Sequence, residues 1–189
     1  MASVSVMDEK KTDERGRPDP PQEGNEVATL LGFLDYQRAT LAWKSRGLSD
    51  EQLRVSIPPT SMTLGGLLKH LAYVEDYWFG EVVAGEPPAD PSAAVHWEAG
   101  PDWEWRTSAD QTGVELRALW SERVGRSRAV VDAQLEKGED EALGETHSAW
   151  DGQGRVSFRW VLVHMVEEYS RHNGHADLLR EAIDGETGE

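Results

Sequence analysis

The chain has 189 residues, a length typical of a single domain with a hydrophobic core. Its 35 acidic residues outnumber its 19 lysines and arginines, and the formal charge of -16 argues against binding to nucleic acids or anionic membranes. The absence of cysteine excludes disulfides, thiolate metal sites and cysteine nucleophiles, so histidines and carboxylates would have to hold any metal ion.

Residues 1–24 are predicted to form a disordered tail, because they are polar, charged and rich in proline. This segment has no apolar stretch of the kind found in signal peptides, and no run in the chain approaches the roughly 18 apolar residues of a membrane span. We therefore expect a cytoplasmic protein that does not contact membranes.

The first helix is predicted from Asn25 to about Gly47, because apolar residues recur there at three- and four-residue steps. Arg38 interrupts this apolar stripe. Its guanidinium could contact an anionic substrate group near the end of the core, or extend into solvent while its aliphatic part covers the core. A short helical turn is expected within residues 48–54.

The second helix is predicted between a cap at Thr60, Ser61 or Thr63 and an end at Gly85. Leucine, valine and tryptophan residues recur along it at helical spacing. His70 lies at the edge of this apolar face, where a polar side chain can reach a neighbouring helix.

A long loop is predicted over residues 87–107, because proline, glycine and tryptophan occur there without a sustained period. Its tryptophans Trp97, Trp103 and Trp105, together with Trp120, could line a pocket for a small apolar or aromatic substrate. Packing in the core or on the surface is the alternative. Among them, Trp105 is our candidate for substrate binding.

The third helix is predicted to begin after a capping box that pairs Thr107 or Ser108 with Gln111, and to end near Lys137. Residues 138–156 are acidic and rich in turn-forming residues, so we expect a solvated excursion that could include a short hairpin. Long loops are therefore expected both before and after the third helix.

The fourth helix is predicted from a cap at Ser157 to an end at Asp184 and Gly185, followed by a tail of residues 186–189. Strand-like alternation of useful length does not occur in the sequence. Four long helices and two long loops predict an all-α fold, most economically a four-helix bundle that spans residues 25–185.

Residues 164–175 read HMVEEYSRHNGH and place many ionisable groups on a helix that should be partly buried. At about 100° per residue, His164, Glu168, His172 and His175 share the apolar stripe of this helix. Glu168 and His172 are four residues apart, so their side chains project side by side from adjacent turns. This is the spacing that one metal ion needs from two ligands on one helix.

His70 is the natural candidate for a third ligand, because facing helices of a bundle can converge on one ion. Two imidazoles and one carboxylate suit catalytic zinc and also ferrous iron. A metal ion would offset the cost of burying the glutamate, although a structural network of polar groups fits the spacing equally well. His164 and His175 could replace a ligand or orient one, whereas His96 and His147 are interpreted as ordinary loop residues.

Two stretches of the sequence resemble the DinB-like, YfiT-type metal-binding four-helix bundles. They are TLGGLLKHLAYVEDYWF at residues 63–79 and WVLVHMVEEYSRHNGHADLLREAIDG at residues 160–185. The most similar branch is the one related to mycothiol-dependent maleylpyruvate isomerase and the mycothiol S-transferases. The resemblance implies that His70, Glu168 and His172 are the metal ligands.

The same resemblance implies a function. In related thiol-dependent transferases and isomerases, a divalent metal, commonly zinc, holds the sulfur of a small thiol as thiolate. This chain would need an external thiol, with mycothiol as the first candidate, and a small electrophile as the second substrate; nickel or iron could replace zinc. The alternative is a non-catalytic metal-binding helical module with a structural or partner-binding role, which could form a homodimer.

Overall fold

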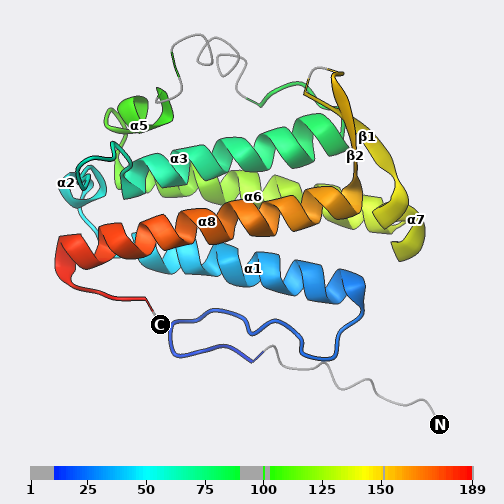
Figure 1. Cartoon of the computed structure of the whole chain (residues 1–189), viewed down its shortest axis with the longest axis horizontal. Coiled ribbons are helices and arrows are strands. Elements are labelled where there is room, and N and C mark those ends of the chain that lie inside the picture. Colours follow the sequence, from blue (N-terminus) through cyan, green and yellow to red (C-terminus); the bar gives the residue numbers. More distant parts are fainter. Residues whose placement is uncertain (1–10, 90–99, 101–102, 151, 189) are drawn as a thin grey trace.

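The computed structural model describes residues 11–89, 100, 103–150 and 152–188. The long helices are α1 (Glu26–Ser45), α3 (Leu64–Glu75) with its π-helical continuation η1 (Asp76–Val83), α6 (Gly113–Leu135) and α8 (Phe158–Asp184). They run side by side along the longest dimension of the molecule (Figure 1). Helix α8 packs on α1, whereas α3 packs on α6 and also contacts α8. The predicted all-α four-helix bundle is confirmed.

Capping side chains determine where the long helices begin and end. Ser157 accepts a hydrogen bond in the first turn of α8, and Gly185 closes that helix with a φ of 79°, both as predicted. The third long helix, α6, begins later than predicted. Its N-cap is Thr112, which forms a capping box with Glu115 in place of the predicted box ending at Gln111.

Shorter elements connect the long helices. They are α2 (Asp50–Leu53), α5 (Trp103–Ser108), α7 (Glu139–Gly144) and an antiparallel hairpin of β1 (Thr146–Ala149) and β2 (Gly154–Ser157). The hairpin expected in the acidic excursion is therefore present. The predicted loop 87–107 instead ends in α5, because its tryptophans pack on α3 although the sequence lacks a helical period. Trp97 and His96 lie outside the described residues.

In the described part of the chain, we find no helix with the length and apolar character needed to cross a membrane.

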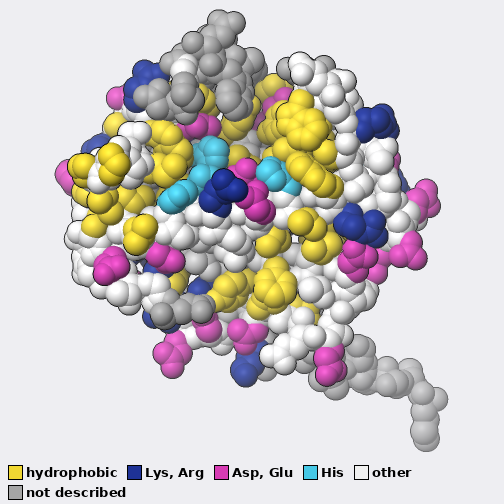
Figure 2. Space-filling model, in the orientation of Figure 1, with side chains coloured by type: hydrophobic (Ala, Val, Ile, Leu, Met, Phe, Trp, Pro, Cys, Tyr) yellow, Lys and Arg dark blue, Asp and Glu magenta, His cyan; other side chains and the backbone are white. Residues whose placement is uncertain are grey.

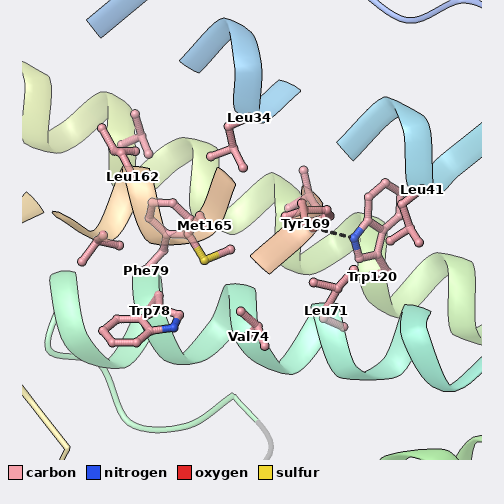
Figure 3. Packing of buried hydrophobic residues seen from close by; sticks show 14 of the residues in the cluster. Leu34, Leu41, Leu71, Val74, Trp78, Phe79, Trp120, Leu162, Met165 and Tyr169 are labelled. Carbon is pink, nitrogen blue, oxygen red and sulfur yellow. Dashed lines mark hydrogen bonds between the residues drawn. The ribbon is translucent and has the colours of Figure 1, made fainter. Parts of the chain in front are cut away.

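The hydrophobic core fills the space between the long helices (Figure 3). Leu34 and Leu41 of α1, Leu71 of α3, Trp120 of α6 and Met165 of α8 are all buried there. Trp120 is thus a core residue, which agrees with the alternative that this tryptophan packs in the core.

A buried polar network joins the long helices inside this core. Glu75 of α3 accepts hydrogen bonds from Nε and Nη2 of Arg38 on α1, at 2.8 and 2.7 Å. Its Oε1 also accepts one from the Tyr169 hydroxyl of α8 at 2.7 Å, and that hydroxyl accepts one from Trp120 Nε1 of α6 at 2.8 Å. Each of the long helices therefore contributes one side chain to the network.

The network accounts for the position of Arg38. Its guanidinium is buried and bound to Glu75, so the expectation that it extends into solvent is wrong. Burial would lower the pKa of Arg38, but the charge and hydrogen bonds of Glu75 outweigh this and raise it above its ordinary value. Burial and the charge of Glu75 raise the pKa of Tyr169, which stays a neutral hydrogen-bond donor.

The segments on either side of the bundle meet at Trp43 of α1. The guanidinium groups of Arg15 and Arg17 lie over the Trp43 ring, at 4.4 and 5.1 Å from its centroid, and its Nε1 donates to Glu186 at 2.7 Å. Arg17 is only 5% exposed. Residues 11–24, expected as part of a disordered tail, are thus packed against α1, because cationic side chains stack on its aromatic rings; residues 1–10 are not described.

We predict that Glu75→Ala lowers the free energy of unfolding by about 3–5 kcal/mol, because it leaves the Arg38 charge buried without a partner. Chemical denaturation followed by circular dichroism measures the change. The double variant Arg38→Met/Glu75→Leu removes both charges and should regain a large part of the loss. Glu122→Ala, at an exposed glutamate, is the control; an equal effect of this variant and Glu75→Ala would contradict the prediction.

Candidate metal centre

His70 of α3 and Glu168 and His172 of α8 form a compact cluster. Each offers one ligand atom, and the three atoms lie within 4.8 Å of one another. His172 Nε2 is 3.3 Å from Glu168 Oε2, and the ring centroids of His70 and His172 are 4.6 Å apart. Ligands at zinc distances in a tetrahedral site are about 3.4 Å apart, so small side-chain adjustments suffice to enclose an ion. The structure thus brings the three predicted residues together.

The buried network helps to align the two helices that carry these residues. Glu75 follows His70 by five residues on α3, and Tyr169 precedes His172 by three on α8. The hydrogen bond between Tyr169 and Glu75 therefore fixes α3 against α8 close to the cluster. A slide of one helix along the other would break this bond and separate the imidazoles.

Glu104 of α5 contacts His70. Its Oε1 lies 3.2 Å from Nδ1 of His70, and its side chain is almost completely buried. A proton on Nδ1 donated to this carboxylate leaves the Nε2 lone pair for an ion, and such carboxylate partners raise the basicity of ligating histidines. Sequence analysis missed Glu104, because it lies in a segment without periodicity; its one signal is a carboxylate between two tryptophans.

Trp105 borders the cluster through His70. Their ring centroids are 5.5 Å apart. The indole lies across α3 at Gly66, where a Cβ atom would come within 2.2 Å of Trp105 Cε3. Glycine at this position therefore allows α5 to approach α3 closely enough for Glu104 and Trp105 to contact the same histidine. A place for Trp105 next to a bound substrate remains a prediction.

His164 and His175 lie beside the ligand candidates on α8. His175 Nδ1 is 3.5 Å from His172 Nδ1, the ring nitrogen opposite the one that faces Glu168. His164 Nε2 is 3.4 Å from Glu168 Oε1, the other carboxylate oxygen. Among the described residues, His164 groups with Glu167 and Glu168 rather than with the two ligand histidines.

Other predicted candidates lie elsewhere. Arg38 is in the bundle interior, where Glu75 binds its guanidinium. His147, interpreted from the sequence as an ordinary loop residue and not as a candidate, is on β1, and burial lowers its pKa. Trp103 is buried against Tyr73 of α3, with 6.0 Å between ring centroids.

The surroundings of Glu168 favour its ionised form. The hydrogen bond from His172 lowers the pKa of Glu168, burial opposes this, and the charges of His164, His172 and His70 reinforce the decrease. The carboxylate therefore needs to lose no proton when a metal binds. Histidine and acidic side chains gather on one face of the molecule, with hydrophobic side chains on both sides (Figure 2).

A model of the mycothiol S-transferase family matches residues 29–185, which include all but the first residues of the bundle. The chain belongs to the mycothiol S-transferase family. This confirms the resemblance to the DinB-like bundles. No curated protein matches the chain. The matched range contains all three residues of the cluster in this family member, His70, Glu168 and His172, and also Glu104.

For this mycothiol S-transferase family member, we predict that Glu104→Gln lowers zinc affinity by about 10- to 100-fold, because an amide no longer holds the His70 imidazole as a carboxylate does. Competition with a chromophoric chelator measures the affinity. Glu122→Gln, at an exposed glutamate, is the matched control. Equal affinities of the Glu104→Gln and Glu122→Gln variants would show that Glu104 does not support the ligand.

Proposed function

We propose that this chain is a divalent-metal-dependent S-transferase that joins mycothiol to small electrophiles, with His70, Glu168 and His172 as the ligands of the metal. The observation that carries the proposal is the convergence of these three ligand atoms within 4.8 Å, inside the range that the family model matches. Zinc is the first candidate metal, with nickel or iron as alternatives. A cytoplasmic location, where small thiols are kept reduced, forms part of the proposal.

The donor set fits the chemistry. When bound, a divalent ion would lower the pKa of a coordinated thiol and so supply a thiolate at neutral pH. The thiol must come from outside, because the chain has no cysteine. In the transfer, mycothiol loses its S–H proton to solvent, its sulfur forms a bond to the electrophilic carbon, and the leaving group departs with the electron pair of the bond that breaks.

The residues around the ligands have separate tasks. Glu104 holds His70 through Nδ1, and His175 contacts the corresponding nitrogen of His172. Both contacts keep the ligand histidines in one orientation, which limits the reorganisation needed during the reaction. The side chains of His70 and Glu168 keep about a fifth of their surface exposed, and this edge of the cluster gives the two substrates access.

The grouping of His164 supports catalysis over a purely structural ion. Three protein ligands leave a coordination position open, whereas structural zinc sites have four protein ligands. His164, the candidate for a fourth ligand, faces the opposite oxygen of Glu168 and groups with Glu167. His175, the other candidate, contacts the His172 nitrogen opposite the one that faces Glu168. The non-catalytic module is the second candidate, and a fourth protein ligand for its ion would require a rearrangement of His164 or His175.

We predict one tightly bound zinc, nickel or iron ion per chain in protein purified without chelators. His172→Ala should abolish this binding, because His172 is one of the three proposed ligands. Helicity should change little, because alanine favours helix. Elemental analysis and circular dichroism measure the two quantities. His147→Ala, outside the cluster, is the control. Stoichiometric metal retained in the His172→Ala variant would overturn the ligand assignment.

We further predict that the metal-loaded chain conjugates mycothiol to members of a panel of electrophiles, and that chelation removes this activity. Mass spectrometry of the thioether product measures the transfer, and added zinc should restore it. Conjugation that persists without metal would contradict the proposed role of the ion. Stoichiometric metal without conjugation across the panel would favour the non-catalytic module.

A further inference from the structure

Four aromatic side chains form a continuous surface next to the candidate metal centre. We call this surface, made of Trp78, Trp150, Trp160 and His164, the aromatic wall. Trp78 is its hub, with ring centroids 5.8 Å from Trp150, 5.2 Å from Trp160 and 4.8 Å from His164. The rings of Trp160 and His164 are stacked, 4.8 Å apart with 18° between their planes. The wall is assembled from η1, the hairpin turn and α8.

Two of these rings are exposed although they are large and apolar. Trp150 is 46% exposed and Trp160 is 40% exposed, whereas Trp78 beneath them is buried. Single exposed apolar residues are common, but these two contact each other, with centroids 5.8 Å apart, and share one support. Core packing therefore does not account for them.

Neighbouring residues hold Trp150 in an unusual backbone conformation. Its backbone has a φ of 52°, a left-handed conformation that bulky residues rarely adopt. The backbone N–H of Trp150 donates to the Tyr77 hydroxyl at 2.9 Å. A Cβ atom on Gly154 would come within 2.6 Å of the Trp150 ring. A strained backbone that holds an exposed indole in one place is typical of a binding site.

The wall adjoins the metal centre through Glu168. His164 Nε2, at the end of the wall, is 3.4 Å from Glu168 Oε1, and Glu168 Oε2 is 3.3 Å from His172. Figure 2 shows hydrophobic side chains directly beside the gathered histidine and acidic side chains. A ligand on the wall would thus lie about one side chain away from the reacting thiol.

We propose that the aromatic wall binds the ring of an aromatic electrophile, so that the chain prefers aromatic to aliphatic co-substrates. This inference rests on the proposed transferase function. Indole faces and edges attract a further aromatic ring in stacked or edge-to-face arrangements, beyond the gain from buried area. Tryptophans held by neighbours lose little conformational entropy when a ligand binds. The wall therefore holds the ring, while the electrophilic carbon extends past His164 toward the ligands.

The test compares two α-bromoketones, phenacyl bromide and bromoacetone, with the zinc-loaded full chain and mycothiol. In both reactions the sulfur–carbon bond forms as the carbon–bromine bond breaks, with release of bromide and a proton. Trp160→Ala should lower kcat/KM for phenacyl bromide about tenfold, mainly through KM, and change that for bromoacetone by less than about twofold. Trp160→Phe, which keeps a ring, should retain most of the preference.

A second variant protects the test against misfolding. Trp150→Gly removes an indole while glycine adopts the positive φ without strain, and it should also lower kcat/KM for phenacyl bromide selectively. Leu178→Ala, at an exposed apolar residue elsewhere on α8, is the control and should affect neither substrate. Equal losses for both ketones, or no loss in either tryptophan variant, would overturn the inference.

Binding without reaction separates this inference from the proposed function. Quenching of tryptophan fluorescence by acetophenone, which lacks the leaving group, needs neither thiol nor metal. It should weaken in Trp160→Ala and persist in His172→Ala. If acetophenone quenches the fluorescence but no conjugation is found, the result counts against the transferase and leaves the wall as an aromatic-binding surface. If Trp160→Ala changes neither the quenching by acetophenone nor the conjugation of phenacyl bromide, the proposed binding of aromatic rings by the wall is refuted.

Discussion

The buried ion pair between Arg38 and Glu75 is the interaction on which the arrangement of the bundle depends. Taking two charges out of water costs several kcal/mol for each ion, and only close hydrogen-bonded geometry offsets this. The Tyr169 hydroxyl adds a further hydrogen bond to the carboxylate from a third helix. Because a single register of the helices satisfies these groups together, the network specifies which faces of α3 and α8 meet, and His70 and His172 are on those faces.

The candidate metal centre lies at the boundary between this rigid interior and solvent. His172 is buried close to the network, whereas His70 and Glu168 keep about a fifth of their side-chain surface exposed. One side of the cluster is thus fixed by packing and the other can be reached by small molecules. Glu104 adds support from α5, outside the bundle proper, so the long connection before α6 also shapes the site.

Much of the fold and of the ligand set could be predicted from the sequence, because both depend on local spacing. Helical periodicity and caps gave the bundle, and the four-residue step from Glu168 to His172 put two ligands on one face. The partner of Arg38 could not be predicted, because Glu75 looks like an ordinary polar position until α3 is packed against α1. Glu104 was missed for a similar reason, since its segment lacks a helical period in the sequence and becomes part of the site only where α5 packs on α3.

The aromatic wall illustrates the same limit on a larger scale. Helices α5, α6 and α7 and strand β1 lie between Trp78 and Trp150 along the chain, and β2 lies between Trp150 and Trp160, so no spacing rule links the three residues. Their association depends on the left-handed turn at Trp150 and on the small size of Gly154. The tryptophans that the sequence suggested for a pocket, Trp97, Trp103, Trp105 and Trp120, are therefore a different set of rings.

The contacts of Trp43 have a consequence for how the chain can be handled. Arg15 and Arg17 from one flank of the bundle and Glu186 from the other meet on this one indole, so the two flanks are close in space. Figure 1 shows the C-terminal end beside the segment that precedes α1. A short linker could therefore join the flanks, and new ends opened at the exposed hairpin would give a circular permutant with the same packed helices.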